Sequence, residues 1–359
     1  MKGQKILKKL GSAPRILLVR NDGLGDLILT LPLAVAIKAQ LPGAHLSALV
    51  SRPLIPLVEM IGEFDGVLAD EGILLKRHRE KRTSNELRLL EEDLLELVRR
   101  ERFDAALVVY AEGASARLVY RARIPLRAGP RRRIFGWRFN ISFGRTRRGS
   151  TQAEYELNLG FLPLLGLREE FVFPTLKLPL PPERAGVMLH PYKRNETALS
   201  WPLERFVELA RAFAAAGEEV SVVGDAQDEP VLAEHFGGLE GVKIHTDQTL
   251  AELVGLIAGA RLFIGNSSGP LHIAGLTRTP HVGFFPLNRV SAPARWRTLP
   301  GGGENAPDPE KYLLAPELDY GCVTCRRERC PHFNCVAGIS FDRVRQAIAA
   351  WGLEPPVGD

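Results

Sequence analysis

The sequence lacks the features that mark membrane-spanning or secreted proteins. No apolar stretch in its 359 residues approaches the roughly 20 residues that a membrane-spanning helix needs. Residues 1–10 contain no secretory hydrophobic region and no small-residue cleavage site. Internal repeats and low-complexity segments are also absent. With 45% hydrophobic and 25% charged residues, the chain is expected to be a globular protein of the cytoplasm.

Cysteine is scarce, yet all four cysteines fall within residues 322–335 in the pattern C-x2-C-x4-C-x4-C. Disulfides are disfavoured in the cytoplasm, so four clustered thiols indicate a structural tetrahedral site for zinc or iron. The candidate ligands are Cys322, Cys325, Cys330 and Cys335, with His332 as a possible substitute for one thiol. The second and third spacings match no standard zinc finger, so a segment without metal is the alternative.

Acidic residues are missing from residues 121–148, which contain ten arginines. Because arginine binds phosphate bidentately, this segment predicts an anionic partner, either a phosphorylated glycolipid or a membrane surface; a solvated basic loop is the alternative. The basic residues 1–10 could also lie on an anionic membrane. No nucleic-acid motif accompanies the charge, so we expect no nucleic acid, although Trp137 and Phe139 could stack on bases. The arginines are Arg121, Arg123, Arg127, Arg131, Arg132, Arg133, Arg138, Arg145, Arg147 and Arg148.

Strand and helix patterns alternate along the chain, which predicts an α/β protein with parallel sheets covered by helices on both faces. The crowded prolines of residues 174–182 interrupt the periodicity and indicate a linker between domains 1–178 and 183–359. The second domain would include the cysteine segment and a terminal helix. Two such domains facing each other would leave a cleft at the carboxyl ends of their strands. The predicted strands are 15–20, 45–50, 66–69, 104–110, 186–190, 219–223, 242–244 and 261–265. The predicted helices are 27–40, 53–61, 84–103, 201–216, 228–236 and 249–259.

The helix at 84–103 has the clearest pattern in the chain. Thr83 and Glu86 form a plausible capping box at its start. Its predicted apolar face consists of Leu87, Leu90, Leu94, Leu97 and Val98.

The turn at residues 20–26, R-N-D-G-L-G-D, is the most informative local motif. It lies where a buried strand passes into a helix, and glycines there allow a tight bend close to a ligand. Asp26, near the helix start, is the first candidate for chemistry; an ordinary helix cap is the alternative. Gly23 and Gly25 without a third glycine are only a weak dinucleotide signal.

A second turn of this kind follows the strand predicted at 261–265. Its polar loop 266–269 leads into a helix that has Pro270 near its first position. The unpaired amides and small hydroxyls of such a loop form a good anion site. The two turns together suggest a ligand held between two domains.

Several motifs in this order resemble glycosyltransferase family 9, the ADP-heptose:lipopolysaccharide heptosyltransferase family. They are Gly25-Asp26 with Thr30 and Pro32, His190-Pro191, residues 200–206 (S-W-P-L-E-R-F), residues 265–272 (G-N-S-S-G-P-L-H) and the cysteine segment. The resemblance implies two Rossmann-like domains in the glycosyltransferase B architecture, with the acceptor on the first domain and the nucleotide sugar on the second. It also implies inversion at the transferred sugar, no catalytic metal, and Asp26 as the general base.

Two departures from the family pattern concern the donor site. Ser267 stands where many members carry aspartate, and Leu199 stands where many carry lysine. Lys193, Arg194 or Arg20 could supply the missing cation. The other predicted donor-binding residues are Ser268, Gly269, His272, Asp228 and Glu229, of which His272 could instead be structural and the two acids could simply start a helix. The predicted acceptor or phosphate-binding residues are Arg20, Gly25, Arg131, Arg132 and Arg133.

The resulting prediction is a heptosyltransferase that acts on a lipopolysaccharide core acceptor, an anionic glycolipid, at the inner face of the cytoplasmic membrane. A protein heptosyltransferase, or a transferase that uses another nucleotide sugar, is the alternative within glycosyl transfer. A dinucleotide-binding oxidoreductase is less favoured, because residues 49–52, L-V-S-R, offer no acid at the end of the second strand. A non-catalytic sugar-binding relative is also possible.

Overall fold

A computed structural model describes residues 2–76, 82–145, 147, 150–179, 181, 183–191, 199–300, 306–317, 322, 325, 326 and 329–356. The chain divides into two compact units, the first formed by Met1–Arg147 and Glu154–Lys177 and the second by Arg148–Ala153 and Leu178–Asp359. Each unit contains one sheet with parallel strands, as expected from the strand and helix alternation.

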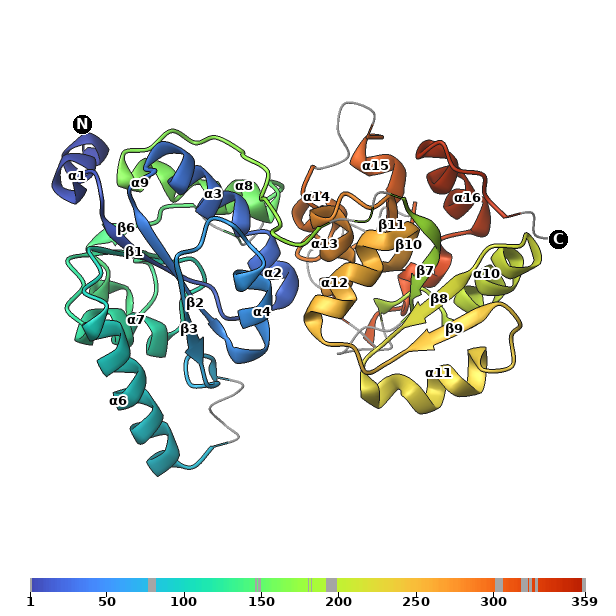
Figure 1. The fold of residues 1–359 in the computed structure, drawn as a ribbon, viewed down its shortest axis with the longest axis horizontal. Coiled ribbons are helices and arrows are strands. Elements are labelled where there is room, and N and C mark those ends of the chain that lie inside the picture. The colour runs from blue at the N-terminus through green and yellow to red at the C-terminus, as the bar shows by residue number, and fades with distance from the viewer. Residues whose placement is uncertain are drawn as a thin grey trace. The chain divides into compact units, whose positions relative to one another are not determined.

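The first unit has a six-stranded sheet in the order β3-β2-β1-β4-β5-β6 (Figure 1). Its strands are β1 (Arg15–Val19), β2 (His45–Ser51), β3 (Gly66–Asp70), β4 (Ala105–Val108), β5 (Leu126–Gly129) and β6 (Ile141–Ser142). Its helices are α1 (Lys2–Leu10), α2 (Leu24–Ile28), α3 (Leu31–Gln40), α4 (Ile55–Glu59), α6 (Ser84–Arg100), α7 (Gly113–Arg121), α8 (Glu154–Leu159) and α9 (Leu162–Leu165). Short 3-10 turns occur at η1 (Arg52–Leu54) and η2 (Gly136–Arg138).

Helices α6 and α7 cover one face of this sheet. Leu17 and Val19 of β1 pack there with Leu94, Leu95 and Val98 of α6. The capping box of Thr83 and Glu86 is present at the start of α6. The predicted apolar face was wrong at Leu97, which is 46% exposed, because the buried stripe passes through Leu95 instead.

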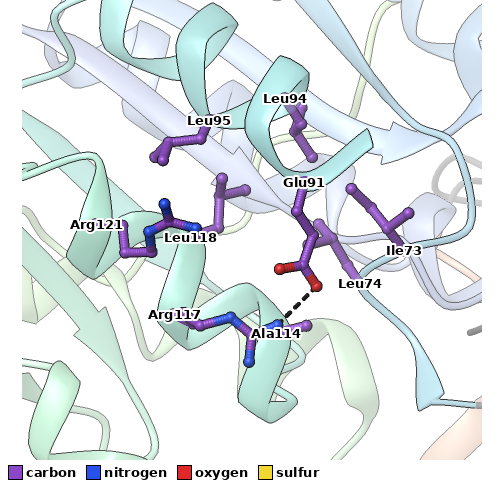
Figure 2. Close-up of a pocket in the computed structure, with 9 residues that line it drawn as sticks. All are labelled: Ile73, Leu74, Glu91, Leu94, Leu95, Ala114, Arg117, Leu118 and Arg121. Carbon is purple, nitrogen blue, oxygen red and sulfur yellow. Dashed lines mark hydrogen bonds and ion pairs between the residues drawn. The ribbon is translucent and has the colours of Figure 1, made fainter. Parts of the chain in front are cut away.

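A crevice between α6 and α7 is lined by apolar side chains such as Leu94 and Leu118 (Figure 2). Glu91 and Arg117 face each other there and form an ion pair of 2.7 Å. The cavity volume of about 10 Å³ admits at most one water molecule. This crevice is therefore a packing feature of the first unit.

The second unit repeats the design with the order β12-β11-β10-β7-β8-β9 (Figure 1). Its strands are β7 (Ala185–His190), β8 (Val220–Val223), β9 (Val242–His245), β10 (Ala260–Asn266), β11 (His281–Phe284) and β12 (Leu313–Leu314). Its helices are α10 (Leu203–Ala215), α11 (Glu229–Phe236), α12 (Leu250–Gly259), α13 (Gly269–Leu276), α14 (Pro293–Trp296), α15 (Pro309–Tyr312) and α16 (Phe341–Ala350). Two 3-10 turns, η4 (Ala226–Asp228) and η6 (Cys335–Gly338), complete the elements discussed below.

The strand order reverses once in each sheet. The reversal lies between β1 and β4 in the first unit and between β7 and β10 in the second. In open α/β sheets, ligands bind outside the carboxyl ends of the strands at this point. The turns after β1 and β10 both lie there, so the topology favours the same two turns that the sequence singled out.

None of the described helices is long and apolar enough to cross a membrane.

Candidate active site

The turn after β1 is organised by Arg20, whose side chain is only 2% exposed. The Arg20 peptide N–H donates to the Leu49 carbonyl at 3.1 Å, which holds the residue against β2 as the chain leaves the sheet. Its guanidinium donates to Asp22 at 2.7 Å, to Glu154 at 3.2 Å, and to Asp26. One buried cation therefore aligns three carboxylates.

Burial alone would lower the pKa of Arg20, but the charges of Asp22, Asp26 and Glu154 outweigh it and the net shift is upward. Arg20 stays charged and engaged within the first unit. This arrangement is at odds with the prediction that Arg20 binds a phosphate of the donor or acceptor, because its cation is both enclosed and paired.

Asp26 lies in the first turn of α2 and keeps 24% of its side chain exposed. Burial raises the pKa of Asp26 to about 7; Arg20 opposes this shift, and the charges of Asp22 and Glu154 add to it. A carboxylate with this pKa is far more basic than an ordinary aspartate and is ionised in a large fraction of molecules near neutral pH. It can accept a proton from a hydroxyl that reaches its exposed edge.

Gly23 has a steric reason to be glycine. Its φ of −160° is ordinary extended backbone. A Cβ at this position would lie 2.8 Å from Oδ2 of Asp26, closer than real side chains approach. The glycine therefore leaves room for the carboxylate.

Glu154 is a functional candidate that the sequence reasoning did not identify. It is fully buried at the start of α8 and also accepts from Arg147 Nε at 2.7 Å. Arg147 Nη2 donates to Asn158 at 2.7 Å, and Asn158 in turn donates to the Leu29 carbonyl at 2.9 Å. This chain of polar contacts ties α8 to the turn that carries Asp26. The signal was the i, i+4 spacing of Glu154 and Asn158, which places both side chains on the same face of a helix.

In the second unit, Asn266 at the end of β10 joins three segments. Its Oδ1 accepts from the Trp201 peptide N–H and its Nδ2 donates to the Pro191 carbonyl, both at 2.8 Å. Trp201 stacks on Phe284 and donates from its indole nitrogen to the Ile339 carbonyl at 2.9 Å. The family-like motifs around residues 190, 201 and 266 thus meet at one place.

The loop after β10 places small residues at the start of α13. Ser268 precedes the helix, and its hydroxyl donates to the Asn266 carbonyl at 2.9 Å and lies 3.3 Å from Nδ1 of His190. Because the hydroxyl has a single hydrogen, Nδ1 of His190 is the donor in that second contact. Burial lowers the pKa of His190 to about 4, so this histidine is neutral.

His272 is 3% exposed in α13, and burial, with a smaller effect of His281, lowers its pKa to about 3. A neutral ring cannot act as a phosphate-binding cation. Within the described part of the chain, its Nδ1 has no hydrogen-bond partner. Because buried polar atoms usually have a partner, this ring nitrogen of His272 is a candidate to bind a ligand or to hold the loop before α13.

The remaining predicted donor residues have local roles or fall outside the description. Asp228 accepts a hydrogen bond from the Asp225 peptide N–H at 2.9 Å. This contact is the one expected of an acid that simply starts a helix. Glu229 opens α11 and is exposed. Lys193 and Arg194 lie outside the described residues.

Arg131, Arg132 and Arg133 are exposed in the connection between β5 and β6. Gly25 lies inside α2 and accepts through its carbonyl from the Leu29 peptide N–H at 3.0 Å.

The four cysteines are half-buried free thiols. Burial, together with the charges of the other three cysteines, raises the pKa of the Cys335 thiol, whereas a backbone contact to Leu287 lowers it. Nevertheless, no group of three or more metal-binding side chains in the described residues is arranged to hold a metal ion.

The model of glycosyltransferase family 9 (heptosyltransferase) matches residues 179–305. A putative glycosyltransferase of Haemophilus influenzae is 24% identical, with 79% of this chain and 86% of the relative covered. The chain is therefore similar to glycosyltransferase family 9, and the relatives it matches support that family. A lipooligosaccharide heptosyltransferase 2 of Campylobacter jejuni is also 24% identical, over 45% of this chain and 49% of the relative.

Solved structures share the fold of this glycosyltransferase. The family 9 glycosyltransferase of Veillonella parvula has a TM-score of 0.73 at 17% identity, covering 94% of this chain and 97% of that one. The E. coli ADP-heptose lipopolysaccharide heptosyltransferase II has a TM-score of 0.71 at 19% identity, covering 94% and 98%. The iron-containing dodecameric glycosyltransferase TibC of E. coli is less similar, with a TM-score of 0.53 at 17% identity over 96% and 79%. These neighbours confirm the glycosyltransferase B fold predicted from the sequence.

Proposed function

We propose that this glycosyltransferase transfers heptose, with inversion, from ADP-heptose to a hydroxyl of the lipopolysaccharide inner core. The names of two relatives support the donor and the acceptor class: an ADP-heptose lipopolysaccharide heptosyltransferase among the structural neighbours and a lipooligosaccharide heptosyltransferase among the sequence relatives. The reaction takes place at the inner face of the cytoplasmic membrane.

The observation that carries the proposal is the accessible, basic carboxylate of Asp26 at the carboxyl end of β1. A sugar hydroxyl is a poor nucleophile and must lose its proton as its oxygen attacks. Asp26 accepts that proton while the new bond forms at the anomeric carbon. The bond from that carbon to the diphosphate breaks, and ADP leaves with the electron pair from the opposite face.

The leaving diphosphate gains negative charge, which the second unit stabilises. The groups proposed for this role are the amides at the start of α13 and the hydroxyls of Ser267 and Ser268, which come just before that helix in the chain. Lys193 or Arg194, which follow β7 in the sequence, is the candidate for the cation that many members of the family take from lysine. Gly269 lets the diphosphate approach the backbone, and Asp228 and Glu229 are the candidates for the ribose. This scheme requires no catalytic metal.

The acceptor is an anionic glycolipid. Arg131, Arg132 and Arg133 are exposed and follow the carboxyl end of β5, on the same edge of the sheet as Asp26. Guanidinium groups at this edge suit the phosphates of a lipopolysaccharide core.

The cysteine segment is proposed as a structural zinc or iron site with no part in catalysis. Support comes from the close spacing of the four cysteines in the sequence and from the iron named in TibC. Elemental analysis of protein purified under reducing conditions tests this: about one metal per chain is expected, and a content near zero would remove the site.

A panel of nucleotide sugars and truncated core glycolipids, with products identified by mass spectrometry, tests the reaction. A mass increase of one heptose on a core glycolipid, only with ADP-heptose, is the expected result. Transfer to a polypeptide instead would establish the protein heptosyltransferase alternative. Binding of ADP without any product would favour a non-catalytic relative.

A further inference from the structure

The connection between β5 and β6 exposes large apolar side chains. Ile134 is 100% exposed and Trp137 is 60% exposed. Tyr120 at the end of α7, 43% exposed, contacts Trp137 edge to face with the ring centroids 5.1 Å apart. A wholly exposed isoleucine beside exposed aromatic rings is an unusual surface for a protein that meets only water.

The described arginines of residues 121–148 differ in their partners. Arg121, Arg145 and Arg147 form ion pairs with Glu92, Glu169 and Glu154. The charge of each of these three arginines is balanced by a glutamate, so they add little net positive charge to the surface.

Arg131, Arg132 and Arg133 have no acidic partner within the described residues and stand next to Ile134. Arg138 lies over the Trp137 ring at 4.3 Å from its centroid. The unpaired cations therefore gather around the exposed apolar residues. We call the set Arg131, Arg132, Arg133, Ile134 and Trp137 the basic-apolar loop.

The basic-apolar loop begins at the carboxyl end of β5. Phe135 lies beside Gly113 at the start of α7, where a Cβ on the glycine would be 3.7 Å from the ring. Helix α7 follows β4, so its first residue, Gly113, lies at the carboxyl edge of the sheet. Because Phe135 lies beside Gly113, the first part of the loop lies at the same edge. Asp26 follows β1 at the same edge.

We propose that the basic-apolar loop docks on a bilayer that contains anionic lipid, with Ile134 and Trp137 inserted at the interface and the arginines against lipid phosphates. Tryptophan at such interfaces, and basic residues near anionic headgroups, are the chemistry that peripheral proteins use. A second copy of the chain is a poor occupant, because two such loops would bring like charges together. The inference rests on the proposed function in one respect: docking there presents the edge carrying Asp26 to a lipid-anchored acceptor.

Co-sedimentation of the full chain with vesicles tests the docking. Phosphatidylcholine vesicles with phosphatidylglycerol should bind the protein, and vesicles of phosphatidylcholine alone should bind it far more weakly. Each arginine near an anionic surface contributes about fivefold. The variant with Arg131→Gln, Arg132→Gln and Arg133→Gln should therefore bind roughly 100-fold more weakly.

A matched control carries Arg88→Gln, Arg99→Gln and Arg100→Gln on α6, which are exposed and change the net charge equally. This control should lose less than about fivefold, since the charges lie outside the contact. Equal loss in both triple variants would overturn the proposal, as would binding of the protein to RNA or an acidic protein but not to vesicles.

A second variant, with Ile134→Ser and Trp137→Ser, separates docking from catalysis. It should lose vesicle binding and transfer to a vesicle-embedded acceptor, yet keep turnover on a water-soluble core oligosaccharide. Asp26→Asn should bind vesicles like the parent. Even if the parent and the serine variant both lack transferase activity, the vesicle-binding measurement still tests the docking proposal. Vesicle binding of the serine variant equal to that of the parent would refute the proposal.

Discussion

Glu154→Gln is the change that most sharply tests how the pKa of Asp26 is set. Glu154 shares Arg20 with Asp26 and raises the Asp26 pKa, which lies at about 7. Glutamine keeps an acceptor for Arg20 and Arg147 but removes the negative charge. The pKa of Asp26 should therefore fall, since a repelling charge is lost and Arg20 has one fewer competing carboxylate.

The size of the shift follows from Coulomb's law. At an effective dielectric constant near 20, a unit charge roughly 6 Å away contributes about 3 kcal/mol, or about two pKa units. Because 24% of the Asp26 side chain is exposed, solvent screens the repulsion between the two carboxylates. We therefore expect the pKa of Asp26 to fall by about one unit.

The pH dependence of kcat/KM measures the pKa of the base in the free enzyme. The parent should lose activity as the pH falls through about 7, because Asp26 must be ionised to accept a proton. In Glu154→Gln, the fall of kcat/KM on the acidic side of the profile should move to about pH 6. The maximum value of kcat/KM should be a few-fold lower, because Asp26 is then a weaker base.

Glu156→Gln provides the control, since it removes the same charge from α8 and Glu156 is not among the charges that shift Asp26. Its profile should match that of the parent. If Glu154→Gln keeps the parent limb near pH 7, or moves it upward, the proposed control of Asp26 by Glu154 is wrong.

Three further predictions follow from the two units. Asp26→Asn should be more stable than the parent at pH 8 by about 2–4 kcal/mol and equally stable below pH 4. Burial raises the folded pKa of Asp26 from 3.8 to about 7, so the parent loses stability as the pH rises between these two values and the full penalty is present at pH 8. Denaturant unfolding at the two pH values checks this, and a less stable variant at pH 8 contradicts it. Gly23→Ala should lower kcat about 10–100-fold with an intact fold, because its Cβ would displace the Asp26 carboxylate; unchanged kcat would show that the carboxylate has room. Asn266→Ala should reduce the free energy of unfolding by about 2–4 kcal/mol, because the Trp201 N–H and the Pro191 carbonyl lose their buried partner. A reduction below about 0.5 kcal/mol would mean that other groups bond to these two atoms in place of the Asn266 side chain.

The sequence predicted the long buried strands and the turns that follow them. The predicted helix at 27–40 is two helices, α2 and α3, with a break at Leu29 and Thr30. Strands β5, β6, β11 and β12 were missed: β6 and β12 are only two residues long, and β5 and β11 carry no readable alternation. In each sheet, the missed strands are the last two at one end.

Long-range contacts explain what the sequence could not predict about the site. Asp26 was found because its glycine turn is local. Glu154 was missed because it meets Arg20 from 134 residues away in the chain. For the same reason, composition could not separate arginines paired with distant glutamates, such as Arg121 and Arg145, from the unpaired Arg131.

The central claim is that Asp26 takes the proton from the acceptor hydroxyl, and single-turnover kinetics of Asp26→Asn test it most directly. With ADP-heptose and a core glycolipid, we predict a rate at least about 100-fold below that of the parent, with the dissociation constant for ADP unchanged. A rate within about threefold of the parent, at equal donor binding, would contradict the account.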